Sequence, residues 1–455
     1  MKLFDDTIIG ISTALSKGAI SIIRLSGDDA IKIVNKVFKG IDLSKVEPNT
    51  INYGHIVDFD SCQIIDEVLV SIFKAPKSYT KEDVVEINCH GGLFVTNKIY
   101  EQLVLLGARP SEPGEFTKRA FLSGRIDLTK AEAVMDVINA ENSAALKIAN
   151  SALNGKISTF VDQKRQELLD IIATISVNID YPEYDDVEQL TNEDILPKLK
   201  TIKLELEDVL NNAKSAKLLK NGINTVIVGK PNVGKSSLLN TLIGENKAIV
   251  TNIPGTTRDI VEASINLGQV TLNLIDTAGI RITEDVVEKI GVEKSKEQIN
   301  KADIILCVLD GSEPINEQDK EILNEIKNKC HLTIINKIDL EQKINLGEVD
   351  DNVLFISTKN NNTIKELENK ILETLNLNNL FNKDITYISN ARQLEKINFA
   401  IKALDEALTT IENEATIDFV DIDIRKAWLY LGEIVGQTST DNLLDELFSK
   451  FCLGK

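Results

Sequence analysis

Residues 225–236 read Thr-Val-Ile-Val-Gly-Lys-Pro-Asn-Val-Gly-Lys-Ser. An apolar, strand-like run is followed here by the pattern G-x-x-x-x-G-K-[ST], and the next apolar residues predict a helix from Leu238, Leu239 and Leu242. This order is typical of a phosphate-binding loop, because glycines let backbone N–H groups turn toward phosphates and the helix N-terminus adds its positive end. We expect Lys235 to contact the β- and γ-phosphates and Ser236 to bind Mg²⁺.

Short apolar runs alternate with helical segments on both sides of this loop. The runs lie at 225–228, 271–275, 304–309, 332–335 and 353–356. Such alternation predicts a Ras-like, doubly wound α/β domain with a parallel sheet, which we place at residues 219–379. Three of the runs end in polar motifs: Asp276-Thr277-Ala278-Gly279, Asn336-Lys337-Ile338-Asp339 and Ser357-Thr358-Lys359. Because each motif stands at the carboxyl end of a predicted strand, we expect all three at one ligand site.

The second motif predicts that the base is guanine. The Asp339 carboxylate only accepts hydrogen bonds, and guanine offers N1–H and its 2-amino group together. Adenine would leave a buried charge unpaired, a loss of ~10⁴ or more in discrimination. We expect Asp276 to hold Mg²⁺ through water and the Gly279 N–H to sense the γ-phosphate. The residues predicted to contact GTP are Asn232, Val233, Gly234, Lys235, Ser236, Ser237, Thr251, Thr256, Thr257, Asp276, Gly279, Asn336, Lys337, Asp339, Ser357, Thr358 and Lys359.

Hydrolysis needs a group other than the glutamine that orients water in Ras-like enzymes, because Ile280 stands at that place. The loop 251–259 supplies Thr257 as the expected third Mg²⁺ ligand, with Ser236 and Asp276. The Asn232 side chain, with the carbonyls of Thr251 and Ile253, is a candidate K⁺ site; the alternative is a turn residue. Glu288 is a candidate for positioning the water. Its spacing alone favours a solvated carboxylate at a helix start.

The rest of the chain predicts two further domains. Residues 1–120 alternate strand-like and helical segments and predict a small α+β domain. Residues 121–218 and 380–455 are mostly helical, so we expect one helical domain with the α/β domain inserted into it.

Composition and charge bound the possible functions. The net charge of −19 disfavours broad nucleic-acid binding by this chain alone. The five cysteines include no Cys-x-x-Cys pair, which argues against a zinc site or a disulfide framework. The apolar runs are too short to span a membrane, and the first residues lack a signal-peptide pattern. We therefore expect a cytoplasmic protein.

Nine further motifs extend the pattern over nearly the whole chain. They are Asp6-Thr7-Ile8, Gly18-Ala19-Ile20, residues 23–27, residues 78–86, His90-Gly91-Gly92, residues 113–117, residues 119–122, residues 127–133 and the terminal Phe451-Cys452-Leu453-Gly454-Lys455. With these motifs the sequence resembles the MnmE (TrmE) family of tRNA-modification GTPases, with Leu453 where the family has Ile.

This resemblance implies several roles. The family hydrolyses GTP in a K⁺-dependent way while its G domains dimerise, which implies a K⁺ site from Asn232, Thr251, Ile253 and Thr256. Lys235, Thr257 and Glu288 are then the catalytic residues. The N-terminal domain of the family forms a homodimer and binds 5-formyl-tetrahydrofolate, and the folate positions here are Arg24, Glu86, Arg125 and Lys455. Without the resemblance, Arg24, Glu86 and Arg125 would be ordinary surface charges.

The family acts on tRNA with an FAD-dependent partner, the MnmG-type protein. Together they add a carboxymethylaminomethyl or aminomethyl group at C5 of the wobble uridine. Cys452 is a candidate nucleophile, a docking element or a redox bystander. Two other functions stay open: a ribosome-assembly GTPase, although no basic RNA-binding module is visible, and a nucleotide-switched scaffold that binds folate.

Overall fold

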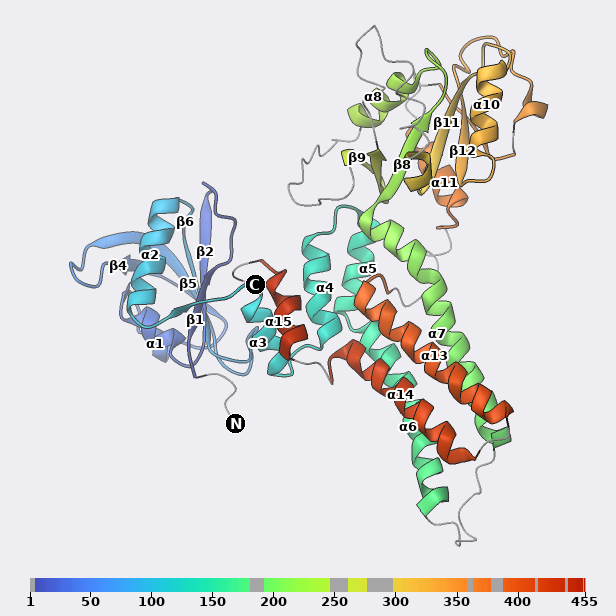
Figure 1. Cartoon of the computed structure of the whole chain (residues 1–455). Coiled ribbons are helices and arrows are strands. Elements are labelled where there is room, and N and C mark those ends of the chain that lie inside the picture. The colour runs from blue at the N-terminus through green and yellow to red at the C-terminus, as the bar shows by residue number, and fades with distance from the viewer. Residues whose placement is uncertain are drawn as a thin grey trace. The chain divides into compact units, whose positions relative to one another are not determined.

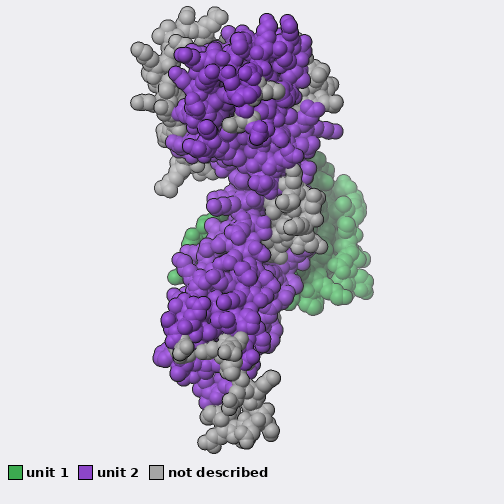
Figure 2. Space-filling view, turned by 90° about the vertical axis from the view of Figure 1, so that its right-hand side faces the viewer, with its two compact units in different colours: residues 1–135, 432–455 green, residues 136–431 purple. Residues whose placement is uncertain are grey.

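The computed structural model describes residues 5–180, 192–245, 261–275, 298–349, 351–357, 363–377, 388–413, 416–437, 441–452 and 454. It divides into two compact units (Figure 2). The first contains residues 1–135 and 432–455, and the second contains residues 136–431.

The first unit is built on a seven-stranded sheet, as far as its described residues show, with the strand order β3-β4-β5-β6-β2-β1-β7. Its strands are β1 (Ile8–Ile11), β2 (Ile20–Ser26), β3 (Phe38–Lys39), β4 (Thr50–Val57), β5 (Ile64–Phe73), β6 (Val84–His90) and β7 (Arg109–Pro110). Helices α1 (Ala30–Asn35) and α2 (Leu93–Leu105) pack on one face of this sheet (Figure 1). Because side chains alternate along a strand, Val68, Val70 and Ile72 of β5 enter this core.

The opposite face of the sheet carries large apolar side chains that are exposed to solvent. Tyr53 on β4 pairs with Leu69 on β5, and their exposed fractions are 60% and 46%. Ile51 and Ile20 on the same face are exposed by 69% and 61%. Exposed groups of large apolar side chains are common at protein–protein contact surfaces.

The C-terminal segment packs against α3 (Glu115–Leu122) in the same unit. Helix α15 (Asp441–Ser449) contributes Phe448 to a small core with Leu128 at the start of α4 (Leu128–Ile138). Gly114 takes a left-handed φ of 69°, and a Cβ there would lie 2.7 Å from the carbonyl oxygen of Phe448. Only glycine therefore allows this close approach of the chain end.

The second unit begins with long helices that run side by side (Figure 1). They are α5 (Ser143–Leu153), α6 (Lys156–Asp180), α7 (Asn192–Asn221), α13 (Ala391–Glu412) and α14 (Ile417–Val435). An ion pair and a hydrogen bond join some of them: Lys203 of α7 pairs with Asp405 of α13 at 2.5 Å, and Arg425 of α14 donates to the Ser176 hydroxyl of α6 at 2.9 Å.

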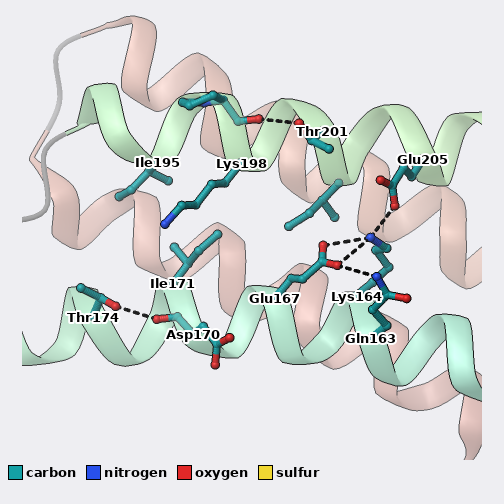
Figure 3. Close-up of a pocket in the computed structure, with 12 residues that line it drawn as sticks. Gln163, Lys164, Glu167, Asp170, Ile171, Thr174, Ile195, Lys198, Thr201 and Glu205 are labelled. Atoms are coloured by element: carbon teal, nitrogen blue, oxygen red, sulfur yellow. Dashed lines mark hydrogen bonds and ion pairs between the residues drawn. The ribbon is translucent and has the colours of Figure 1, made fainter.

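A cavity of about 570 Å³ lies between α6 and α7 (Figure 3). Lys164, whose side chain is only 3% exposed, donates to Glu167 at 2.8 Å and pairs with Glu205 across the cavity. Ile171 and Ile195 supply apolar lining. Two carboxylates compensate the buried charge of Lys164, so this lysine does not need a ligand in the cavity as its partner. We therefore interpret the cavity as a gap in the packing of α6 against α7.

A six-stranded sheet follows, counted over the described part of this unit, in the order β13-β12-β11-β8-β10-β9. Its strands are β8 (Ile223–Val228), β9 (Val261–Leu267), β10 (Val270–Ile275), β11 (Ile304–Asp310), β12 (His331–Asn336) and β13 (Val353–Phe355); its helices are α8 (Lys235–Glu245), α10 (Glu317–Ile326) and α11 (Thr363–Thr374). The central β11 is buried along its whole length, as expected of a parallel strand covered on both faces.

The predicted fold class, α/β and helical, is confirmed. One strand was missed: β9 pairs antiparallel with β10 at the edge of the otherwise parallel sheet. The three predicted domains, 1–120, 121–218 with 380–455, and 219–379, stay a prediction.

Candidate nucleotide and anion sites

The phosphate loop leaves β8 through backbone conformations that favour glycine. Gly229 and Gly234 have φ values of 146° and 100°, and Asn232 lies in the left-handed region at 65°. A Cβ on Gly229 would lie 2.4 Å from the carbonyl oxygen of Val308 on the neighbouring β11. The loop can therefore form only with glycine at this place, which leaves its backbone free to surround an anion.

Lys235 is the first residue of α8, and its ammonium folds back into the loop. Nζ donates to the carbonyl oxygens of Gly229 at 2.5 Å and Lys230 at 2.7 Å. Burial lowers the pKa of this ammonium from its ordinary value. Phosphate oxygens would offer it charged acceptors at the same place, and these are stronger partners than carbonyls.

The predicted base loop lies directly beside the phosphate loop. Asn336, at the end of β12, donates from Nδ2 to the carbonyl oxygen of Val233 at 3.0 Å, although 103 residues separate the two in sequence. A Cβ on Gly234 would lie only 2.1 Å from this same nitrogen. The Asp339 carboxylate accepts a hydrogen bond of 3.0 Å from the Ser357 hydroxyl.

The hydrogen-bond acceptors of the base loop suit a guanine base. Asn336 is 1% exposed, and its Oδ1 has no hydrogen-bond partner within the described parts of the chain. A buried polar atom without a partner is costly, so a ligand that reaches it gains affinity. With the carboxylate of Asp339 nearby in sequence, the loop offers acceptors for a base that carries donors.

Two lysines of these loops are held by acidic residues that the sequence motifs did not indicate. Lys230 pairs with Glu313 at 3.0 Å and with the buried Asp319 at 3.2 Å. Lys337 pairs with Asp310 at 2.5 Å. Asp310 ends the strand next to the one that carries Asn336. Because ligand sites gather at the carboxyl ends of parallel strands, this position was a signal by which Asp310 could have been found.

Ten of the predicted GTP contacts lie within the described residues. They are Asn232, Val233, Gly234, Lys235, Ser236, Ser237, Asn336, Lys337, Asp339 and Ser357. The remaining predicted residues lie outside the described residues: Thr251, Ile253, Thr256, Thr257, Asp276, Gly279, Glu288, Thr358, Lys359 and Lys455. The left-handed backbone of Asn232 suits a turn residue and leaves its predicted K⁺ role open.

A second group of polar residues lies on the open face of the first unit. Arg24 of β2 stands opposite Glu86 of β6 in the strand pairing, and its Nε donates to Glu86 Oε1 at 2.8 Å. Both Arg24 and Arg125 lie over the ring of Tyr79, with 5.8 Å and 4.8 Å from Cζ to the ring centroid. Arg24 Nη1 also donates to the carbonyl oxygen of Gly454 at 3.3 Å.

Two of the predicted folate residues, Arg24 and Arg125, thus lie over one aromatic ring, and the third, Glu86, pairs with Arg24. An adjacent hollow of about 410 Å³ is lined by Tyr79, Arg125, Lys77 and Lys81. Guanidinium groups and a carboxylate around an aromatic ring suit a planar ligand that carries carboxylates and a donor-rich edge.

Cys452 is exposed, and its carbonyl oxygen accepts a hydrogen bond of 3.3 Å from the Gly114 N–H. This contact shows how the chain end is held, and it leaves the role of the thiol open. Among the described residues, no cluster of three or more His, Cys, Asp or Glu side chains is placed to hold a metal ion. None of the described helices is both long and apolar enough to cross a bilayer.

Comparisons with known proteins cover the same regions. The family described as GTP-binding protein TrmE N-terminus matches residues 7–125, and the family described as MnmE helical domain matches residues 128–452. A tRNA modification GTPase MnmE from Bacillus cytotoxicus is 50% identical over 455 residues, with 99% of each chain covered. Its counterpart from Bacillus mycoides is 49% identical with the same coverage. The solved G domain of the T. maritima FeoB iron transporter is 27% identical over 33% of this chain and 98% of its own, with a TM-score of 0.25.

Proposed function

This chain belongs to the MnmE family of tRNA modification GTPases, and we propose that it hydrolyses GTP to drive modification of the wobble uridine at C5. The group added is carboxymethylaminomethyl or aminomethyl, and an FAD-dependent MnmG-type protein shares the reaction in a heterotetramer. The observation that carries this proposal is the hydrogen bond between Asn336 and Val233, which joins a base loop and a phosphate loop into one site. The 50% identity with a curated tRNA modification GTPase is the basis for proposing tRNA as the substrate.

The phosphate loop residues perform the binding steps. Lys235 lies where it can exchange two carbonyl acceptors for the β- and γ-phosphate oxygens. Ser236 follows Lys235 in the first turn of α8, and with Thr257 and Asp276 it would hold Mg²⁺, which would neutralise charge that develops between the phosphates. Asp339 selects guanine through N1–H and the 2-amino group.

Hydrolysis rests on two further proposals. A K⁺ ion held by Asn232, Thr251, Ile253 and Thr256 would stabilise the charge developing on the β–γ bridge, in the way an arginine finger does. Glu288 would orient the attacking water, since Ile280 cannot. Both groups become effective when two G domains dimerise.

The open face of the first unit supports a homodimer. Ile51, Tyr53 and Leu69 form an exposed apolar group there. Burying this group against a second copy would stabilise the dimer by about 25 cal/mol per Å² of apolar surface. Arg24 and Glu86 lie on this same face. We propose that they bind 5-formyl-tetrahydrofolate or a related one-carbon folate, with Arg125 and Lys455.

Mass spectrometry of tRNA nucleosides tests the proposal. A strain that lacks the gene should lose the C5-modified wobble uridine, and the wild-type gene should restore it. A gene with Asp339→Asn should fail to restore it, whereas Glu341→Gln, an exposed carboxylate in the same loop, should restore it. Normal modification in the deletion strain would end the proposal and favour a ribosome-assembly or scaffold function. The proposed reaction needs no membrane, and we place it in the cytoplasm.

A further inference from the structure

Asp310 is the last residue of the buried strand β11 and belongs to none of the GTPase motifs. In the parallel pairing of β11 with β12 it stands level with Asn336, the first residue of the base loop. Its side chain is 5% exposed. A carboxylate is rarely buried to this degree without partners that compensate its charge, so its partners indicate its role.

Both oxygens of this carboxylate are engaged, one on each side. Oδ2 accepts from the Lys337 ammonium at 2.5 Å. Oδ1 accepts from the backbone N–H of Ser312 at 2.9 Å and from its hydroxyl at 2.7 Å. Burial alone would raise the pKa of Asp310, but the hydrogen bonds from Lys337 and Ser312 outweigh it and hold the pKa below its ordinary value.

The contact with Asp310 helps to hold the backbone of Lys337 in an uncommon conformation. Its φ of 63° is in the left-handed region, which L residues other than glycine seldom adopt without surrounding contacts. Gln342 also donates to its carbonyl oxygen, at 3.1 Å. Two residues further on stands Asp339, so the backbone turn at Lys337 sets the direction in which Asp339 presents its carboxylate.

Backbone hydrogen bonds also connect the segment after β11 with the base loop after β12. The Gly311 N–H donates to the carbonyl oxygen of Asn336 at 3.0 Å, and the Lys343 N–H donates to the carbonyl oxygen of Gly311 at 2.8 Å. The segment after β11 thus contacts the base loop at its start and just beyond its end. Among these contacts the Asp310–Lys337 pair is the one between opposite charges.

We propose that Asp310 is a positioning residue for guanine recognition: its carboxylate holds Lys337, and through the backbone turn there it fixes the orientation of Asp339 toward the base. This inference rests on the proposed GTP site. Asp310 itself would contact no part of the nucleotide.

Steady-state hydrolysis of GTP and ITP by the full-length protein tests this role. ITP lacks the 2-amino group, so the ratio of kcat/KM for GTP over ITP reports how well Asp339 is placed. We expect Asp310→Asn to raise the KM for GTP by about tenfold and to lower the GTP/ITP ratio by a similar factor, with kcat within twofold of wild type. Glu321→Gln, the same charge change on an exposed position of α10, should behave as wild type.

A double variant shows whether the effect passes through Lys337. If it does, Asp310→Asn should add less than twofold to the KM of Lys337→Met. A lower kcat with unchanged KM and unchanged GTP/ITP ratio would reduce Asp310 to a structural residue and overturn the inference. So would a full tenfold effect of Asp310→Asn in the Lys337→Met background. Equal use of GTP and ITP by the wild type would instead overturn the guanine site itself.

Discussion

Replacing Gly234 by alanine tests the junction between the phosphate loop and the base loop. An added Cβ would lie 2.1 Å from Asn336 Nδ2, and the backbone φ of 100° at this position is one that alanine rarely adopts. The left-handed backbone costs about 1–2 kcal/mol. Displacing the buried Asn336 amide from the carbonyl oxygen of Val233 costs about 1–3 kcal/mol more.

The expected result follows from these two terms. At least about 2 kcal/mol is lost from the site, and since 1.4 kcal/mol is a factor of ten, GDP should bind roughly 30-fold more weakly or worse. Isothermal titration of the Gly234→Ala protein with GDP, at fixed Mg²⁺ and KCl, measures this loss. Its far-UV circular dichroism and Tm report whether the rest of the sheet stays folded.

Gly347→Ala is the matched control in the same sheet domain. A Cβ there would meet its nearest atom, Asn345 Oδ1, at an ordinary contact distance of 3.5 Å. This variant should bind GDP as the wild type does. If Gly234→Ala bound GDP within threefold of the wild type, Asn336 and Val233 would not form the junction described, and the assignment of Asn336 to the base loop would lose its structural support.

Four further results are expected. Turnover of GTP should be much faster in KCl than in NaCl, and Asn232→Ala should remove the difference; equal wild-type rates in both salts would exclude a K⁺ role. Glu288→Ala should keep GDP affinity but slow hydrolysis by about 10²-fold or more, and unchanged turnover would return Glu288 to a solvated carboxylate. Arg24→Met should weaken binding of 5-formyl-tetrahydrofolate by about tenfold in a fluorescence titration, without a change in GTPase rate; full affinity would remove Arg24 from that site. Glu115 should protect the first unit against acid, as judged by the difference in Tm between wild type and Glu115→Gln across pH 3 to 7. Burial raises its pKa, but hydrogen bonds from Arg109, the Glu112 N–H and Arg119 hold it below 4.5, so its stabilisation is present above that pH and is lost as the pH falls through the lower folded-state pKa. A Tm difference independent of pH would contradict this assignment.

The local motifs allow a nucleotide site to be predicted because their chemistry is contiguous in the chain. A phosphate loop needs a strand, glycines and a helix start within about a dozen residues, so Gly229, Gly234 and Lys235 were recognisable by spacing alone. The order of strand ends likewise predicted that Asn336 would lie near the phosphate loop, and the structure confirms it. The edge strand β9 was missed, although its residues alternate apolar and polar side chains as an exposed-edge strand does.

The motifs along the chain were therefore enough to predict a P-loop GTPase domain and the residues of its phosphate and base loops. The side chains that support those loops became visible in the folded chain alone. Asp310 meets Lys337, Glu313 and Asp319 meet Lys230, and Arg24 meets Glu86 because parallel or antiparallel register sets them level, or because loops converge at one end of a sheet. No local spacing encodes such pairs, because the burial of whole strands sets which strands pair and in which register. The register then determines which charged side chains become neighbours.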